Sequence, residues 1–382
     1  MKKLRVVGAL ASIILLLNGC RQESKTITEI QPEAAKPEIA TGTLDEVGID
    51  TEIITGLLDS IREGFYPNRH SLLIYKDDKL VVEEYFKGAD QNWGDDIGVV
   101  VFNDTVLHDM RSVSKSVVSA CIGLAIAQGK IKGVDQPVFD FFEDYGQYKN
   151  EGREKLTLKH LLTMTSGLEW DETIPYTDPK NSEIQMINSG DGIGFVLSRN
   201  LTAEPGTEWK YNGGTTELLA EIIRRVSGKD IHEFAKEALF EPLDIHHTEW
   251  TISPATNTPA AASGLRLTPR DMLKFAILYH QKGKWGIDQL LPKEWVEESL
   301  SSHIDRPNSG GYGYQFWVLD INTPNGHLTV PAAFGNGDQR IYFENTNNLL
   351  VITTAGNYNR WDIEKNSFAM LERIYKASGL LD

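Results

Sequence analysis

The sequence His108-Asp-Met-Arg-Ser-Val-Ser-Lys115 contains the one Ser-x-x-Lys motif of this 382-residue chain, formed by Ser112 and Lys115. The residues that follow, from Val113 to Ile126, have the apolar spacing of a buried helix that begins near the serine. Residues three positions apart share a helix face, so the Lys115 amine can reach the Ser112 hydroxyl. The electropositive helix N-terminus favours the neutral form of a nearby amine and stabilises developing negative charge. These are the conditions under which a lysine activates a serine nucleophile.

The motif alone leaves a second interpretation open, in which Ser112 is an ordinary helix N-cap and Lys115 is exposed to solvent. Other catalytic motifs are absent from the sequence, which has no G-x-S-x-G elbow, no P-loop and no dinucleotide-binding fingerprint. His232-Glu233 is not followed by a second histidine at metalloprotease spacing, and the nine histidines form no ligand cluster beyond His246-His247. We therefore expect serine chemistry without a metal ion or a cofactor.

Three further phrases accompany the Ser-x-x-Lys motif in the sequence: Leu161-Leu-Thr-Met-Thr-Ser-Gly-Leu168, Pro205-Gly-Thr-Glu-Trp-Lys-Tyr211 and Ser263-Gly-Leu-Arg-Leu-Thr-Pro-Arg-Asp271. With these four phrases in this order, the chain resembles the serine β-lactamase and penicillin-binding-protein superfamily. Within it, the chain looks most similar to the class C-like esterase and amidase branch, and there to the 6-aminohexanoate-dimer hydrolases. The resemblance extends from about Leu44 to Ile374.

The resemblance implies that Ser112 attacks an ester or amide carbonyl to form an acyl-enzyme, with Lys115 as its activating base. The second motif of the family is Tyr-x-Asn or Tyr-x-Ser, whose tyrosine transfers protons to and from the nucleophile and the leaving group. Tyr211-Asn212-Gly213 occupies this position here. Tyr211 matches the motif, whereas Gly213 lacks the side-chain hydrogen bond that the family uses to orient substrate.

The third motif of the family, Lys-Thr-Gly or His-x-Gly, is absent as written. Its counterpart is Ala333-Phe-Gly-Asn-Gly-Asp-Gln339, which is similar to the A-x-G-x-G-G-Q of the esterase and amidase branch. By this resemblance the backbone N–H groups of Ser112 and Asn336 form the oxyanion hole, since two converging donors stabilise a tetrahedral intermediate. Phe334 and Asn336 cannot supply the cationic side chain that binds a β-lactam carboxylate. Tyr176, in a proline-broken loop, resembles a substrate-contacting tyrosine of the amide hydrolases.

The pattern of the remaining sequence predicts one mixed sheet made from both ends of the domain, with a helical subdomain inserted in it. The resemblance implies that this α+β fold is of the β-lactamase and transpeptidase type, with an antiparallel sheet flanked by helices. Helical patterning fills about residues 111–263. We further expect a helix over 49–61, a hairpin over 71–86, strands at 314–319, 339–343 and 349–354, and a last helix over 363–374. Because strands occur on both sides of the helical region, we expect one domain over 44–382, and the resemblance implies that the site lies in the cleft between sheet and subdomain.

The first twenty residues look like a bacterial lipoprotein signal. A basic head at residues 2–5 precedes an apolar run that ends at Leu17 and is too short to span a bilayer comfortably, and Gly19-Cys20 follows. Cleavage before Cys20 and lipid attachment there would tether the exported chain to a membrane, on its periplasmic or cell-surface side. A plain secretory signal with an incidental cysteine is the alternative. Residues 21–43 are polar and predict a flexible tether.

The formal net charge of −16 argues against nucleic acid as a partner, because no basic face is available to neutralise phosphates. The motifs together predict an enzyme that hydrolyses a small ester or amide. A class C β-lactamase or a D-Ala-D-Ala peptidase is the alternative within the family, and both need the cationic third motif. A non-catalytic binding lipoprotein is the alternative of another class, against which the intact Ser112, Lys115 and Tyr211 argue.

Overall fold

The computed structural model describes residue 1 and residues 37–381, apart from 255, 308–309 and 324–325. The predicted signal segment, Cys20 and the predicted tether up to residue 36 lie outside the described residues. The compact unit begins at Pro37, several residues before the expected start of the domain. Backbone pairing accounts for this difference, because Leu80 N donates to Ala40 O at 2.8 Å and Gly42 N donates to Leu80 O at 3.1 Å.

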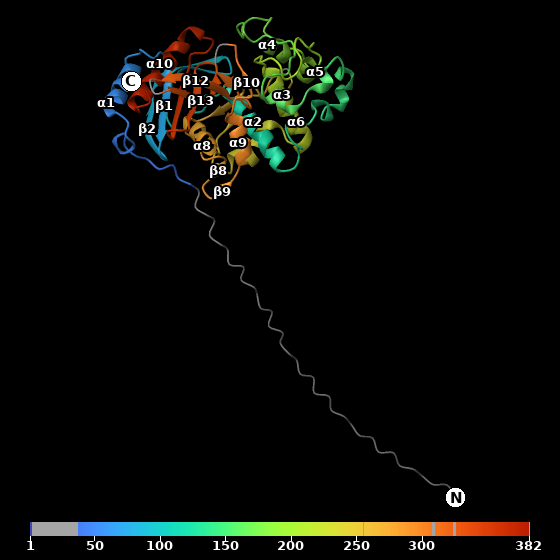
Figure 1. The fold of residues 1–382 in the computed structure, drawn as a ribbon, viewed down its shortest axis with the longest axis horizontal. Helices are drawn as coiled ribbons and strands as arrows, with labels where there is room; N and C mark the ends of the chain where they lie inside the picture. The colour runs from blue at the N-terminus through green and yellow to red at the C-terminus, as the bar shows by residue number, and fades with distance from the viewer. Residues whose placement is uncertain (2–36, 255, 308–309, 324–325, 382) are drawn as a thin grey trace. The chain divides into compact units, whose positions relative to one another are not determined.

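One large antiparallel sheet organises this unit (Figure 1). Its strands, in spatial order, are β10 (Ile304–Asp305), β11 (Gly311–Tyr312), β12 (Trp317–Thr323), β13 (Gly326–Gly335), β14 (Gln339–Glu344), β15 (Leu349–Ala355), β1 (Arg69–Lys76) and β2 (Lys79–Tyr85). Strands from the two ends of the domain therefore lie side by side at the β15–β1 pair, where Leu72 faces Thr353. This arrangement confirms the predicted sheet made from both terminal parts of the domain.

The remaining strands form three small sheets, and helices cover the large sheet. The small sheets pair β3 (Lys87–Asn92) with β4 (Asp95–Val101), β5 (His108–Asp109) with β7 (Leu265–Leu267) and that with β6 (Glu249–Trp250), and β8 (Lys284–Trp285) with β9 (Asp288–Gln289). The α-helices are α1 (Thr51–Arg62), α2 (Val113–Ala127), α3 (Leu158–Leu162), α4 (Ser182–Ile187), α5 (Gly192–Leu197), α6 (Gly213–Ser227), α7 (Ile231–Ala235), α8 (Pro269–His280), α9 (Lys293–Leu300) and α10 (Glu364–Ala377).

Alternation along the central strands creates two separate hydrophobic cores, because successive side chains of a strand point to opposite faces. In β1, Leu72 and Ile74 join the core formed with α1 and α10, whereas Leu73 and Tyr75 join the core formed with α2, α8 and the helical region. Figure 1 shows α1 and α10 together on one side of the sheet, and α3, α5 and α6 grouped beyond α2. Burial of each such side chain contributes about 1.5–3 kcal/mol.

The predicted fold class and most predicted elements are confirmed. The helix α1, the β1–β2 hairpin, the β14–β15 hairpin and the helix α10 all lie where the periodicity placed them. The strand expected from Tyr314 is wrong at its start, because β12 begins at Trp317. Gln315 has a positive φ of 64° and its backbone N–H donates to Leu162 O at 2.9 Å, so it leaves the ladder to contact the helical region.

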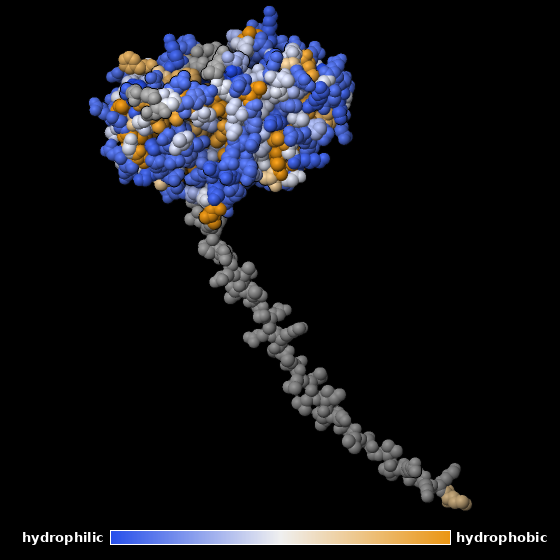
Figure 2. Space-filling model, viewed as in Figure 1, coloured by the Kyte–Doolittle hydropathy of each residue, from blue (hydrophilic) through white to orange (hydrophobic). Residues whose placement is uncertain are grey.

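The face of residues 37–381 seen in Figure 2 is mostly hydrophilic, with small scattered apolar areas. Such a surface is the ordinary way in which a folded domain avoids association. Within the described part of the chain, no helix combines the length and the apolarity that crossing a bilayer requires.

Candidate active site

Ser112 occupies the turn that leads into α2, as the sequence predicts. It is the N-cap residue of the helix, and Lys115 Nζ lies 3.1 Å from its Oγ. The Lys115 side chain is buried, with 1% of its surface exposed. The interpretation in which Lys115 is a solvent-exposed lysine beside an ordinary N-cap is therefore wrong. The hydrophobic helix α2 carries the amine into the interior, where water does not compete for its hydrogen bonds.

Ion pairs and a hydrogen bond hold the strained turn before Ser112 in place. Arg111 has a φ of 47°, a left-handed conformation that is costly for a residue with a side chain. Its guanidinium pairs with Asp109 at 3.2 Å, and Arg266 pairs with the same carboxylate at 3.0 Å. The backbone N–H of Trp93 donates to Asp109 at 2.6 Å. The buried Asp109 carboxylate thus ties the turn to β7 and to the β3–β4 hairpin.

A second oxygen orients the Lys115 amine. Lys115 Nζ donates to the carbonyl oxygen of Ala262 at 3.0 Å, and the Ala262 N–H donates in turn to Glu217 Oε1 at 2.9 Å. Ala262 directly precedes the phrase that begins at Ser263, so this phrase of the family pattern meets the Ser-x-x-Lys motif in space. The buried amine is thus held between Ser112 Oγ and the carbonyl oxygen of Ala262.

Tyr211 lies beside the same amine. Lys115 Nζ is 5.1 Å from the centroid of the Tyr211 ring, and the ring stacks on Trp317 with a centroid distance of 5.6 Å. Burial and the nearby charge of Glu172 raise the pKa of Tyr211 well above its ordinary value, although interaction with Ser112 acts in the opposite direction. The phenol therefore keeps its proton at neutral pH, which suits a group that passes a proton on and does not act as a phenolate base.

The structure brings four of the predicted site residues into one cleft of about 1000 Å³, namely Ser112, Tyr176, Tyr211 and Asn336. Asn336 follows β13 directly, and its side-chain amide donates to Asn359 Oδ1 at 2.8 Å. A Cβ atom on the neighbouring Gly335 would collide with the carbonyl oxygen of Met110. Glycine at this position therefore lets the end of β13 approach the turn that carries Ser112.

The wall of the cleft is aromatic and carries three guanidinium groups, those of Arg306, Arg340 and Arg360. Trp209, Trp317 and Phe334 line it from both the helical region and the sheet. Arg306 lies over the Trp317 ring at 4.7 Å, and Arg340 lies over the Phe334 ring at 4.1 Å. The Arg340 guanidinium also pairs with Asp338 at 3.0 Å. The sequence interpretation placed no cation near Phe334, because Arg340 reaches it only across the β13–β14 pair.

A buried pair of carboxyl groups lies where the second motif departs from the family pattern. Glu172 accepts hydrogen bonds from the Gly213 N–H, from Trp170 Nε1 at 2.5 Å and from the Tyr176 hydroxyl at 3.1 Å. Burial, together with the charge of Glu183, raises the pKa of Glu172 to about 8. The Lys115 ammonium opposes this rise without cancelling it. Glu172 therefore holds a proton in the fold over most of the neutral range.

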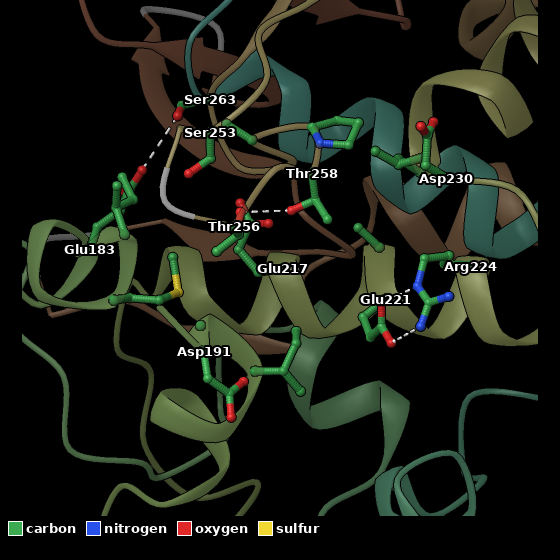
Figure 3. Close-up of a pocket in the computed structure, with 18 of the residues that line it drawn as sticks. Glu183, Asp191, Glu217, Glu221, Arg224, Asp230, Ser253, Thr256, Thr258 and Ser263 are labelled. Carbon is green, nitrogen blue, oxygen red and sulfur yellow. Dashed lines mark hydrogen bonds and ion pairs between the residues drawn. The ribbon is translucent and has the colours of Figure 1, made fainter. Parts of the chain in front are cut away.

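Glu183 and Glu217 also form part of the wall of a second cavity, of about 330 Å³, shown in Figure 3. Ser263 donates to Glu183 at 3.4 Å there, as the dashed line in the figure shows. Burial is the main cause that raises the pKa of Glu217 to about 7, and the charge of Glu183 adds to the effect. Glu172 and Glu217 both interact electrostatically with Lys115, and both have raised pKa values, so the charge of the site changes near neutral pH.

A histidine cluster lies behind the Ser112 turn, contrary to the expectation from the sequence. His70, Asp90 and His108 are all buried, and their candidate ligand atoms lie within 4.8 Å of one another. Burial is the largest cause that lowers the pKa of His70 to about 2 and of His108 to about 4, so both rings are neutral at physiological pH. Residues so far apart in the sequence give no spacing signal, which is why the pattern search did not find this cluster.

Sequence reasoning missed the groups that surround the predicted site residues. It did not single out the three acids Glu172, Glu183 and Glu217, nor the three cleft arginines. Glu172 has the one available signal, since it lies in the same loop as Tyr176. The others come from separate elements whose proximity depends on the packing of the helical region against the sheet.

The sequence that forms this site matches a known protein family. The model of the Beta-lactamase family matches residues 70–370 of the chain, which includes every residue of the cleft described above. The chain therefore belongs to the β-lactamase family. The expected superfamily and fold are confirmed.

Curated relatives match parts of the chain. Monacolin J acid methylbutanoyltransferase from Aspergillus terreus is 32% identical over 111 residues, which are 28% of this chain and 27% of that enzyme. The 6-aminohexanoate-dimer hydrolase of Paenarthrobacter ureafaciens is 25% identical over 205 residues, which are 51% of this chain and 50% of that enzyme. The matches thus span from about a quarter to half of the length of these relatives.

A solved structure extends the likeness over most of the domain. A Bacillus anthracis protein classed with the 6-aminohexanoate-dimer hydrolases superimposes with a TM-score of 0.70 and 20% sequence identity. The match covers 91% of this chain and 89% of that chain. At this level of identity the likeness establishes the common fold alone.

Proposed function

We propose that the protein hydrolyses a small ester or amide through an acyl-enzyme formed on Ser112. The observation that carries the proposal is the buried contact between Lys115 Nζ and Ser112 Oγ, at 3.1 Å, at the start of α2. A lysine that is shielded from water and held against a serine hydroxyl is positioned to take its proton. The names of two relatives, a methylbutanoyltransferase and a dimer hydrolase, support acyl transfer to water or to another acceptor.

In the proposed reaction, the Lys115 amine accepts the proton of the Ser112 hydroxyl while Oγ forms a bond to the substrate carbonyl carbon. The carbonyl oxygen becomes an oxyanion, and the backbone N–H groups of Ser112 and Asn336 donate to it. The intermediate collapses, and Tyr211 delivers the proton to the departing alcohol or amine, replenished from the Lys115 ammonium. Water then adds to the ester carbonyl of the acyl-enzyme by the same proton path in reverse.

The lining of the cleft supports a compact, uncharged acyl group. Its rings, Trp209, Trp317 and Phe334, offer apolar area, and Arg306 and Arg340 lie over two of them. Aromatic walls with a few fixed polar groups are typical of sites for small molecules. The Tyr176 hydroxyl, held by Glu172 at 3.1 Å, is the group we assign to substrate contact.

A fluorophosphonate probe tests the proposal, because it reacts only with an activated serine. We expect labelling of the wild-type chain at Ser112, identified by mass spectrometry, and its loss in Ser112→Ala together with turnover of short acyl esters and amides. Ser119→Ala is the matched control, since Ser119 lies in the same helix, is buried and has no hydrogen-bond partner among the described residues. A label on Ser114 or Ser116 would refute the assignment, and a chain that neither labels nor turns over any ester would support the binding lipoprotein.

We further propose that the enzyme works outside the cytoplasm, tethered by lipid on Cys20. The support is the basic head, the short apolar run and the Gly19-Cys20 pair of the sequence. The chain between Cys20 and Pro37 would then separate the catalytic unit from the membrane surface.

A further inference from the structure

The cluster of His70, Asp90 and His108 joins three separate elements. His70 comes from β1, Asp90 from β3 and His108 from β5. His70 Nδ1 lies 2.6 Å from His108 Nε2, and Asp90 Oδ1 lies 3.8 Å from the same His108 nitrogen. The three side chains are 0%, 2% and 0% exposed, so no bulk water reaches them.

The outer nitrogens of both imidazoles face oxygens that can only accept. His70 Nε2 lies 3.2 Å from Asn68 Oδ1, and His108 Nδ1 lies 3.5 Å from the backbone carbonyl of Asp109. The orientation of the Asn68 amide is fixed, because Oδ1 accepts from Ala89 N and Nδ2 donates to Ala89 O, both at 2.9 Å. The network therefore assigns the ring protons to the two outer nitrogens, His70 Nε2 and His108 Nδ1.

This assignment leaves two lone pairs directed at each other. A neutral imidazole carries one ring proton, so His70 Nδ1 and His108 Nε2 both lack hydrogen at a separation of 2.6 Å. A third proton between them would create an imidazolium, which burial disfavours. Asp90 adds negative charge beside the pair, and its Oδ2 is buried without a hydrogen-bond partner, while Oδ1 accepts from Tyr358 at 2.8 Å. The guanidinium groups of Arg111 and Arg266 also act on this carboxylate.

We propose that His70 Nδ1, His108 Nε2 and the Asp90 carboxylate bind one divalent transition-metal ion of the Zn²⁺ type. Two imidazoles and a carboxylate form a ligand set typical of Zn²⁺, and each imidazole donates its other N–H to an oxygen, as metal-bound histidines ordinarily do. Zn–N bonds of about 2.0–2.1 Å at a tetrahedral angle place the two nitrogens about 3.3 Å apart. Ligation therefore requires the two rings to separate slightly.

Two glycines make room for the cluster. A Cβ atom on Gly88 would lie 2.5 Å from His70 Nε2, and one on Gly356 would lie 2.7 Å from His70 Cε1 and 2.5 Å from Asn68 Nδ2. Phe102 stacks on the His70 ring at 4.1 Å and closes another side. The imidazole is thus held in one orientation by its surroundings, which lowers the entropic cost of ligation.

The position of the cluster gives the ion a structural role. His108 leads directly into Asp109, whose carboxylate anchors the turn before Ser112. An ion on His108 would tie this turn to β1 and β3 through bonds stronger than the hydrogen bonds present. Because the ligands are buried, we expect the ion to enter during folding or on opening of the β3–β4 hairpin.

The test measures Zn²⁺ on the full-length chain after unfolding with a chelator and refolding with added Zn²⁺. We expect one tightly bound ion per wild-type chain by mass spectrometry, a Tm that rises when Zn²⁺ is present, and the visible absorption of a tetrahedral site when Co²⁺ replaces Zn²⁺. Asp90→Asn should weaken Zn²⁺ binding at least about tenfold, and His108→Ala should abolish it. His327→Ala is the matched control, since His327 is an exposed histidine paired with Asp320 at 3.0 Å.

Two results would overturn the proposal. One is a refolded wild-type chain that binds no more Zn²⁺ than His108→Ala, which would leave a proton shared between the rings as the explanation. The other is equal Zn²⁺ affinity in Asp90→Asn and His327→Ala, which would locate the ion elsewhere. If His108→Ala fails to fold, Asp90→Asn decides, because asparagine has the same size and still accepts the Tyr358 hydrogen bond.

Discussion

A Cβ atom on Gly213 would lie 2.8 Å from Glu183 Oε2, so no side chain fits at Gly213 while the acid pair keeps its place. The same atom would lie 3.2 Å from Glu172 Oε2. The family pattern has asparagine or serine at this position. In this chain a buried carboxyl pair approaches the backbone there, and the Gly213 N–H donates to Glu172. Glycine at position 213, where the family has a side chain, therefore leaves the space that the carboxyl groups of Glu172 and Glu183 occupy.

Gly213→Ala should destabilise the fold and lower kcat/KM for esters. The added methyl group displaces Glu183 or Glu172, and overpacking of this kind costs about 1–3 kcal/mol. Thermal unfolding and ester kinetics measure both effects. Gly146→Ala is the control, because a Cβ atom there meets nothing within 4 Å and the residue needs no positive φ. Equal Tm values for the two variants would contradict the packing argument.

Glu172→Gln should reduce the loss of stability between about pH 5 and about pH 8. The pKa of Glu172 is raised from 4.5 to about 8 in the fold, mainly by burial and next by the charge of Glu183. Its stabilising contribution is fully present below the unfolded pKa and is lost as pH rises through the folded pKa. Glutamine mimics the protonated acid and does not titrate.

The measurement is the Tm of each protein across this pH range. Glu241→Gln, at an exposed glutamate, is the control and should follow the wild type. Glu217, whose pKa of about 7 acts in the same direction, stays in every protein and cancels in the comparison. A Tm of Glu172→Gln that falls from pH 5 to pH 8 by as much as the wild-type Tm would contradict the prediction.

Tyr211→Phe should lower kcat by about 10²–10⁴-fold, the usual contribution of a positioned proton-transfer group. Phenylalanine keeps the ring that stacks on Trp317 at 5.6 Å, so the cleft keeps its shape. The effect should be larger for amides than for activated esters, because a poor leaving group needs the proton more. Tyr148→Phe, at a ring that stacks on Tyr145, is the control. An unchanged kcat for amides would exclude the proton-transfer role.

Short p-nitrophenyl esters should be hydrolysed much faster than penicillins or cephalosporins. Ester cleavage needs an activated Ser112 and an oxyanion hole, whereas a β-lactam also needs its carboxylate bound. Gly213 offers no side chain for this, and Arg340 is already paired with Asp338 at 3.0 Å. Loss of one charge-assisted hydrogen bond costs about 1.5–3 kcal/mol, or about ten- to a hundredfold in rate. Nitrocefin turnover that equals p-nitrophenyl butyrate turnover in kcat/KM would restore the β-lactamase interpretation.

Cys20→Ala should block lipid attachment and leave an uncleaved or released chain. The expectation follows from the sequence before and at Gly19-Cys20. Metabolic labelling with a fatty acid, followed by fractionation of membranes, measures the outcome. Globomycin should cause the wild-type precursor to accumulate, and no accumulation would show that the signal is of another kind. Ester hydrolysis by the variant should be unchanged, because the compact unit begins at Pro37.

Local patterns in the sequence determined the elements whose information lies within a few residues. The i, i+3 spacing of Ser112 and Lys115 fixes their contact as soon as α2 forms, because the geometry of a helix turn decides it. The continuous apolar runs of β1 and β15 likewise suit strands that are buried on both faces. The sequence did not predict the β3–β4 hairpin, whose β4 residues Val99 and Val101 are exposed and carry no alternating signal toward a core.

Only the tertiary structure decided what surrounds the predicted nucleophile. Glu172, Glu183 and Glu217 come from a loop, from α4 and from α6, and each alone looks like an ordinary acid of an acidic chain. The pKa values of Glu172 and Glu217 are raised mainly because both carboxyl groups are buried. This burial depends on how the helical region packs on the sheet. His70 and His108 meet for the same reason, since β1 and β5 belong to different sheets. Long-range packing brings such groups together, and no spacing along the chain records it.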